Sequence, residues 1–175
     1  MENLYYGHME SPVGTLTVVA SDMGLTHVFF PRKGRPAGES FLRKELPGYR
    51  ILLDPIRIAE YTRQLEEYFA SKRISFSIPL DLRGTAFQKK VWSALLGVPY
   101  GHTESYGNIA KKIRRPGAAM AVGAACGANP AAIVVPCHRI VAVDGALTGF
   151  GGGLGVKERL LALEHEALEG SSAGR

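Results

Sequence analysis

The first third of the chain alternates apolar and polar residues in short runs, which is the pattern of half-buried β-strands. Residues 16–19 and 25–30 are rich in β-branched and aromatic side chains, and Asp22-Met23-Gly24 between them predicts a hairpin turn. A Gly-, Pro- and Arg-containing stretch over residues 31–40 indicates a loop, and a second alternating run over 74–80 predicts another strand.

A helix is predicted between these strands. Asp54 is suited to capping a helix N-terminus, and Pro55 stands at the first helical position, where its missing N–H costs nothing. Apolar residues then recur at three- and four-residue steps on one face: Ile58, Tyr61, Leu65 and Phe69.

The periodicity changes at Arg83-Gly84, which we take as a domain boundary. Thr85 and Gln88 form a capping-box pattern before the apolar residues Phe87, Val91 and Leu95. Two further helices, over 105–113 and 118–128, are separated by a basic turn over 114–117, which is the outline of a helix-turn-helix. A last helix is expected over 156–167 and a disordered tail over 170–175. The fold class is therefore α/β, with an N-terminal α/β domain (1–82) and a mostly helical C-terminal domain (83–169).

The helix over 118–128 consists almost entirely of Ala and Gly. It lacks the long side chains that read base edges in a major groove, and its small residues permit close backbone approach. This composition suits a narrow groove or tight helix–helix packing.

The distribution of charged residues changes near residue 82, close to the point where the hydrophobic periodicity changes. Residues 1–81 hold ten Lys or Arg and ten Asp or Glu, so the net charge of +5 arises entirely from the second part. Seven basic residues and a single acid, Glu104, lie between Arg83 and Arg115. This bias indicates a surface that faces a polyanion, although a solvated face would show it too. With no apolar run approaching about 18 residues and no basic flank leading into one, neither a membrane span nor a signal peptide is expected.

The candidate chemistry lies in Pro136-Cys137-His138-Arg139-Ile140, which follows the apolar run 131–135. Titratable and charged neighbours promote the thiolate, which is the nucleophilic form of cysteine. Cys126 is the only other cysteine, so no disulfide framework is expected, and a metal site from Cys126, Cys137 and His138 has too few ligands. The glycine-rich stretch 148–153 lacks the Lys-Ser/Thr ending of a phosphate-binding loop.

The Pro-Cys-His-Arg-Ile sequence resembles the active-site signature of the O6-alkylguanine-DNA alkyltransferases, also called methylated-DNA–protein-cysteine methyltransferases. Further family motifs occur in the same order: Thr85-Ala86-Phe87-Gln88, Val91-Trp92, Pro99-Tyr100-Gly101, Ser105-Tyr106-Gly107, Asn129-Pro130 and Gly152-Gly153-Leu154. The resemblance covers residues 83 to about 168 nearly throughout and implies that they form a mostly helical, winged helix-turn-helix domain that both binds DNA and carries the catalytic residues. Residues 1–82 resemble the family's smaller, ribonuclease H-like domain loosely, through Ser11-Pro12-Val13-Gly14 and Gly24-Leu25.

The resemblance implies direct repair of alkylated DNA. Such a protein flips O6-alkylguanine, or O4-alkylthymine, out of the duplex and transfers the alkyl group irreversibly to its own cysteine, acting once and without a cofactor or metal. Cys137 would be the nucleophile, His138 its base through a water molecule, and Glu164 the carboxylate behind His138. Because neighbouring side chains in a strand point to opposite faces, direct contact between Cys137 and His138 is not expected, and a bridging water removes the difficulty.

The resemblance also assigns binding roles. Tyr106 would hydrogen-bond the flipped base, Asn129 would tie the helix-turn-helix to the active-site strand, and Arg139 would be structural. Ile140 and the Phe150-Gly151-Gly152 loop would line the base pocket. The residues expected to contact DNA are Gln88, Tyr106, Arg115, Ala119, Met120 and Gly123.

Met120 departs from the family, which carries an arginine there that enters the base stack. A thioether cannot donate hydrogen bonds to the orphaned base, but apolar wedges unstack base steps in other minor-groove proteins. We therefore expect Met120 to act as a wedge, with weaker duplex binding.

Two alternatives remain at this point. A lesion-binding relative captures the alkylated base without transferring the group, and Cys137 argues against it. A winged-helix transcription regulator is suggested by the basic helix-turn-helix and opposed by its alanine-rich second helix. The expected partner is double-stranded DNA containing O6-alkylguanine, bound by a monomer able to cluster on DNA, in the cytoplasm and associated with the nucleoid.

Overall fold

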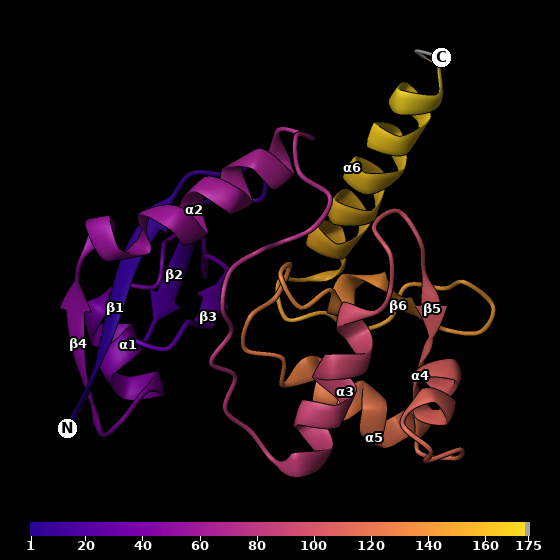
Figure 1. Cartoon of the computed structure of the whole chain (residues 1–175), viewed down its shortest axis with the longest axis horizontal. Coiled ribbons are helices and arrows are strands. Elements are labelled where there is room, and N and C mark those ends of the chain that lie inside the picture. Colours follow the sequence, from indigo (N-terminus) through magenta and orange to yellow (C-terminus); the bar gives the residue numbers. More distant parts are fainter. Residues whose placement is uncertain (174–175) are drawn as a thin grey trace. The chain divides into compact units, whose positions relative to one another are not determined.

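The computed structural model describes residues 1–173, which form two compact units, Met1–Leu82 and Arg83 onward (Figure 1). The first unit contains a four-stranded sheet in the order β3-β2-β1-β4. Its strands are β1 (Glu2–Met9), β2 (Leu16–Ala20), β3 (Leu25–Phe29) and β4 (Tyr49–Leu53). β1 and β2 pair antiparallel, as do β2 and β3, whereas β4 runs parallel to β1. The predicted hairpin over residues 16–30 is confirmed.

Helices cover both faces of this sheet. Leu42 of α1 (Glu39–Glu45) packs in a core with Leu4, Tyr6 and Ile51. On the opposite face, Ile58 of α2 (Pro55–Phe69) lies against Gly7 of β1. Alternate residues of β1 thus serve two cores, as the pleat requires. The predicted start of α2 is confirmed, because the Asp54 carboxylate accepts a hydrogen bond from the Arg57 N–H.

The alternating run over 74–80 was predicted as a strand, and this prediction is wrong. Only Leu80 forms a bridge, with Leu25, and Ile74 is 63% exposed. The Gln64 side chain takes the Ser77 N–H, and Pro79 has no N–H to give to a ladder. Gly24 is required beside this segment, because a Cβ there would lie 2.6 Å from the Pro79 carbonyl oxygen. β1, β4 and α1 were not anticipated from the sequence.

The second unit is mostly helical. It contains α3 (Ala86–Leu96), α4 (Tyr106–Lys112), α5 (Ala119–Gly127) and α6 (Leu154–Ala173), with a short parallel pair formed by β5 (Glu104–Ser105) and β6 (Ile140–Val141). The capping box at α3 is confirmed: the Gln88 N–H donates to the Thr85 hydroxyl, and the Thr85 N–H donates to the Gln88 side chain. The two helices of the predicted helix-turn-helix form as α4 and α5, and the Trp92 indole N–H of α3 donates to the Ala125 carbonyl 2.9 Å away.

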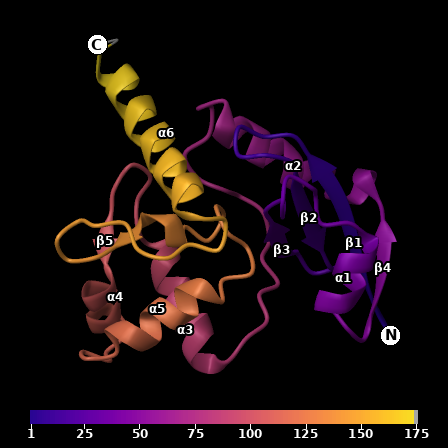
Figure 2. The same ribbon diagram turned by 180° about the vertical axis from the view of Figure 1, so that it is seen from behind.

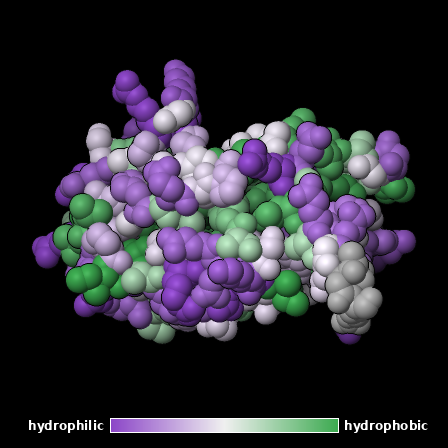
Figure 3. Space-filling view, turned by 90° about the horizontal axis from the view of Figure 1, so that it is seen from above, coloured by the Kyte–Doolittle hydropathy of each residue, from purple (hydrophilic) through white to green (hydrophobic). Residues whose placement is uncertain are grey.

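Helix α6 is longer than predicted. It continues to Ala173, so the expected disordered tail from residue 170 is wrong as far as 173, and residues 174–175 lie outside the described part. In both views the C-terminal half of α6 extends away from the other helices of its unit (Figures 1 and 2). Hydrophilic side chains cover much of the face in Figure 3, between smaller hydrophobic patches. None of the described helices is long and apolar enough to cross a membrane.

Candidate active site

Cys137 lies on a buried 3-10 turn, Cys137–Arg139, rather than on the strand that the sequence suggested. Pro136 precedes the turn and has no N–H for a ladder, and the Arg139 N–H closes back on the Pro136 carbonyl. Ile133, just upstream, is buried with a φ of 75°, which a β-branched residue rarely adopts. In a 3-10 turn successive side chains lie about 120° apart, so Cys137 and His138 do not point to opposite faces as they would in a strand.

His138 and Glu164 form a fully buried hydrogen-bonded pair. His138 Nε2 lies 2.5 Å from Glu164 Oε2. The carboxylate also accepts from Arg139, at 2.8 Å to Nε and 3.2 Å to Nη2, and from the Gly101 backbone N–H at 3.0 Å. Gly101 has φ +77°, and a Cβ there would collide with the Leu168 side chain. Helix α6 and the turn are thus joined through one carboxylate.

The electrostatics of this pair follow from burial and from Arg139. Burial alone would raise the pKa of Glu164, but the hydrogen bonds from His138 and Arg139 outweigh it and hold the pKa at about 2. Burial lowers the pKa of His138, and Glu164 opposes that shift only in part. Glu164 is therefore ionised and His138 is neutral near pH 7, which leaves the imidazole able to accept a proton.

His138 Nδ1 is buried and has no hydrogen-bond partner among the described residues. Since such atoms are normally paired, the free nitrogen has the capacity to take a proton from a nearby donor, directly or through one water. Burial raises the pKa of the adjacent Cys137 thiol, and the Asn129 side chain and Lys157 lower it in part. The thiol thus needs a base, and a base with a free nitrogen is its chain neighbour.

Three more predicted residues surround the turn. Asn129 follows α5, and its side chain donates to the Val135 carbonyl at 2.8 Å and accepts the Ala131 N–H, so it links α5 to the segment before Cys137. Ile140 is fully buried on β6. The Tyr106 hydroxyl, at the start of α4, lies 2.6 Å from the Thr148 hydroxyl.

The predicted pocket wall belongs to the segment between β6 and α6. Phe150 and Gly152 are half-buried, and Gly151 is exposed. The Gly153 N–H donates to the Phe150 carbonyl, and Gly153 has φ +97°, so this turn closes just before α6 begins. The structure thus places this loop directly before the helix that carries Glu164.

The remaining predicted residues lie on the helix-turn-helix and on α3. Met120 is 92% exposed on α5, and Arg115 is exposed in the preceding turn. Gly123 faces the Tyr106 ring, where a Cβ would lie 3.8 Å away, and Ala119 is half-buried. The Gln88 side chain accepts the Thr85 N–H in the α3 capping box. The chief feature of this surface is Met120, an exposed apolar residue on a helix made mostly of Ala and Gly.

Sequence reasoning missed Lys157 and Cys126 as neighbours of Cys137. Both interact electrostatically with Cys137, and burial raises the pKa of Cys126 to about 12. A signal was present for Lys157: together with Leu160 and Glu164 it forms the buried stripe of α6 at positions i, i+3 and i+7. Glu164 was identified through the family resemblance, whereas Lys157 was missed because only the apolar members of that stripe were considered.

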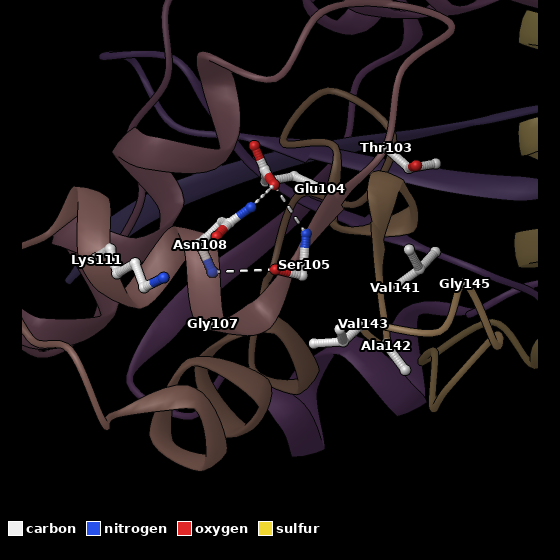
Figure 4. A pocket seen from close by; sticks show the side chains of 10 residues that line it. All are labelled: Thr103, Glu104, Ser105, Gly107, Asn108, Lys111, Val141, Ala142, Val143 and Gly145. Atoms are coloured by element: carbon white, nitrogen blue, oxygen red, sulfur yellow. Dashed lines mark hydrogen bonds between the residues drawn. The ribbon is translucent and has the colours of Figure 1, made fainter.

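A surface pocket of about 460 Å³ lies beside β5, α4 and the hairpin after β6 (Figure 4). Its acidic member, Glu104, is already bonded to the Asn108 side chain and the Ser105 N–H. None of Cys137, His138 and Glu164 lines it. Within residues 1–173 no group of three or more His, Cys, Asp or Glu side chains is placed to hold a metal ion.

Comparisons with known proteins match both units. The family model "6-O-methylguanine DNA methyltransferase, DNA binding domain" matches residues 86–166, and the ribonuclease-like domain of the same family matches residues 4–82. Methylated-DNA–protein-cysteine methyltransferases from Mycolicibacterium paratuberculosis and Methanosarcina acetivorans are 46% and 44% identical, over 91% and 92% of this chain and 91% and 98% of their own. The crystal structure of Mycobacterium tuberculosis OGT in complex with DNA superimposes with a TM-score of 0.82 at 42% identity, covering 93% of this chain and 94% of that one.

Proposed function

Since this chain belongs to the 6-O-methylguanine DNA methyltransferase family, we propose that it repairs DNA by moving the alkyl group of O6-alkylguanine onto Cys137. O4-alkylthymine, which presents the same kind of O-alkyl group, is a second proposed substrate. The observation that carries the proposal is the buried triad: an unpaired His138 nitrogen next to a buried thiol, with Glu164 holding the other side of the ring.

The chemistry proposed for the triad balances without a cofactor. His138 takes the thiol proton through a bridging water, and Glu164 stabilises the imidazolium that forms. The Cys137 thiolate attacks the alkyl carbon, a C–S bond forms, and the C–O6 bond breaks with its electron pair going to guanine. The proton removed from the thiol ends on the guanine. A thioether offers no group that water readily displaces, so the protein acts once.

The DNA face is proposed to be the helix-turn-helix. Double-stranded DNA would lie against α5, whose small residues let the backbone approach closely, with Ala119 and Gly123 at the contact. Arg115 and the N-terminal end of α3 at Gln88 would contact phosphates. Met120 would insert into the base stack where the family carries arginine.

The flipped base would enter beside Tyr106. The Tyr106 hydroxyl would leave its present hydrogen-bond partner, the Thr148 hydroxyl, and bond the edge of the base instead. Phe150 would stack on the base, Gly151 and Gly152 would leave room for its edge, and Ile140 would support the wall from the core. Asn129 would fix the segment before Cys137.

The partner follows from the substrate. We propose that the protein works on chromosomal DNA in the nucleoid, binding as a monomer that clusters along the duplex. The proposed alkyl transfer takes place within one protein molecule and depends neither on oligomeric state nor on cellular compartment.

A mass measurement tests the proposed function. The protein, incubated with a duplex oligonucleotide that contains O6-methylguanine, is expected to gain a single methyl group, and peptide mapping is expected to place it on Cys137. Cys126→Ser serves as the matched control and should gain the same group at the same position. Tight binding to the lesion with no gain in mass would instead favour a lesion-binding protein.

Exchanging Met120 for arginine is expected to strengthen duplex binding by about threefold to tenfold at physiological salt, because one cation is added at the DNA face. It should also raise the transfer rate, since arginine can bond the orphaned base. Ala121→Arg, which adds the same charge at the neighbouring exposed position, is the control and should affect binding but not transfer. Gel-shift titrations and single-turnover rates give both values. Unchanged affinity and rate in Met120→Arg would rule out the wedge.

A further inference from the structure

Lys157 is a buried cation that the proposed chemistry does not use. It lies in the first turns of α6 and has no exposed surface. Its ammonium donates to the Ile140 carbonyl at 2.5 Å and to the Thr148 carbonyl at 3.0 Å. These two acceptors lie at the two ends of the segment that leads from the Cys137 turn toward the predicted pocket wall.

This placement is unfavourable for stability alone. A buried ammonium loses its hydration, and here it also lies near the positive N-terminal end of a helix. No carboxylate lies within ion-pair distance of Lys157 in the part of the chain that the structure describes, so only two carbonyls compensate it. An apolar side chain of similar length would fill the same space at lower cost, so the charge itself calls for an explanation.

The groups that face Cys137 show where that charge acts. Tyr106 from α4, Cys126 from α5 and Lys157 from α6 all interact electrostatically with it, and the neutral Asn129 side chain lowers the pKa of its thiol. His138 is uncharged, and the charge of Glu164 is offset by Arg139. Lys157 is therefore the one full charge among these groups that no carboxylate offsets, and its positive sign favours the thiolate.

Lys157 is also linked to Tyr106 by two hydrogen bonds that share Thr148. Thr148 accepts from Lys157 with its carbonyl, and its hydroxyl lies 2.6 Å from the Tyr106 hydroxyl. Fixing the Thr148 backbone therefore fixes the partner of the side chain proposed to read the base. One ammonium is thus linked to both the nucleophile and the base-binding edge.

We propose that Lys157 is a positioning residue for alkyl transfer, holding the 140–148 segment at both ends while its charge stabilises the Cys137 thiolate. This rests on the proposed function, since the thiolate that Lys157 stabilises is the one that attacks the alkyl carbon. As the C–S bond forms, the negative charge leaves sulfur for guanine O6. The lysine keeps its proton throughout.

The experiment compares Lys157→Met, which keeps the length and removes the charge, with Lys157→Arg, which keeps the charge. All variants carry Cys126→Ser, so that one thiol is counted. The rate of Cys137 modification by iodoacetamide is measured against pH by intact mass. In Lys157→Met the midpoint of the curve of modification rate against pH is expected to rise by about one pH unit, so that the modification rate at neutral pH falls about tenfold. The midpoint for Lys157→Arg should lie closer to that of the parent, because arginine keeps the positive charge.

Arg159→Met is the matched control, because it removes an exposed cation two residues along the same helix. Its curve should coincide with the parent's. A Lys157→Met curve that also coincides with the parent's, with only the melting temperature lowered, would show a merely structural role and overturn the proposal. Because iodoacetamide replaces DNA, the result is independent of alkyl transfer. If Lys157→Met shows the shift but the parent never gains a methyl group from DNA, the proposed function alone is refuted.

A measurement on the unaltered side chain covers the case in which Lys157→Met does not fold. Coupling between two charges is reciprocal, so loss of the thiolate must also change the titration of Lys157. Nitrogen NMR of the buried ammonium, before and after S-methylation of Cys137, is expected to show a lower pKa for Lys157 in the methylated protein. Identical titrations would overturn the proposal.

Discussion

Glu164→Gln is expected to reduce single-turnover alkyl transfer by about a hundredfold or more, the scale of a lost acid–base contribution. The amide cannot stabilise the His138 imidazolium as a carboxylate does. It also leaves the buried Arg139 guanidinium without its counter-charge, which costs about 3–5 kcal/mol of folding free energy when one member of a buried pair is removed. Rates measured well below the melting transition, together with denaturant unfolding, separate the two effects.

Acid unfolding provides a second signature of Glu164. Its pKa in the folded protein is about 2, below the ordinary value of 4.5, so its contribution is present above about pH 4.5 and is lost as the pH falls toward 2. The parent should therefore lose stability across that window more steeply than Glu164→Gln. Glu166→Gln, an exposed acid on the same helix, is the control and should match the parent in rate and in unfolding. A Glu164→Gln variant as active as the parent would remove the carboxylate from the mechanism.

His138→Ala is expected to slow transfer at neutral pH by about 10²- to 10⁴-fold, because the buried thiol then lacks its base. The pH profile distinguishes this role from a structural one. Burial lowers the pKa of His138 below 6.5, so the parent's rate should fall only as the pH drops below that value and the imidazole becomes protonated. Burial raises the pKa of the thiol, so without His138 this acid limb should vanish and the rate should keep rising into alkaline solution.

His165→Ala removes an exposed histidine from α6 and should leave the profile unchanged. Circular dichroism of each variant shows whether the fold is retained. If His138→Ala transfers methyl groups at the parent's rate, or if the parent shows no inflection assignable to an imidazole, His138 is not the base.

Local signals in the sequence correctly predicted those elements whose hydrogen bonds are also local. The Thr85–Gln88 capping box, the Asp54 cap and the hairpin at residues 22–24 join residues a few positions apart, so their outcome depends little on the rest of the chain. The strand predicted over 74–80 does not form, because the Gln64 side chain of α2 accepts the Ser77 N–H and Pro79 has no N–H to donate. β1 and β4 were missed for the related reason that their pairing is set by partners more than forty residues apart.

The sequence by itself identified Cys137, His138 and Glu164 through their family motif, and it defined the basic helix-turn-helix together with the unusual Met120. Tertiary structure decided what those residues can do. Only the fold brings Glu164 of α6 to His138 and Arg139, because their contact spans 25 and 26 residues and depends on where the helix packs. It also decided that Cys137 lies on a 3-10 turn rather than on the expected strand, and that Lys157 is buried with its ammonium on the Ile140 carbonyl, directly after that turn. Burial and long-range contact set the charges of these groups, and neither can be read from local spacing.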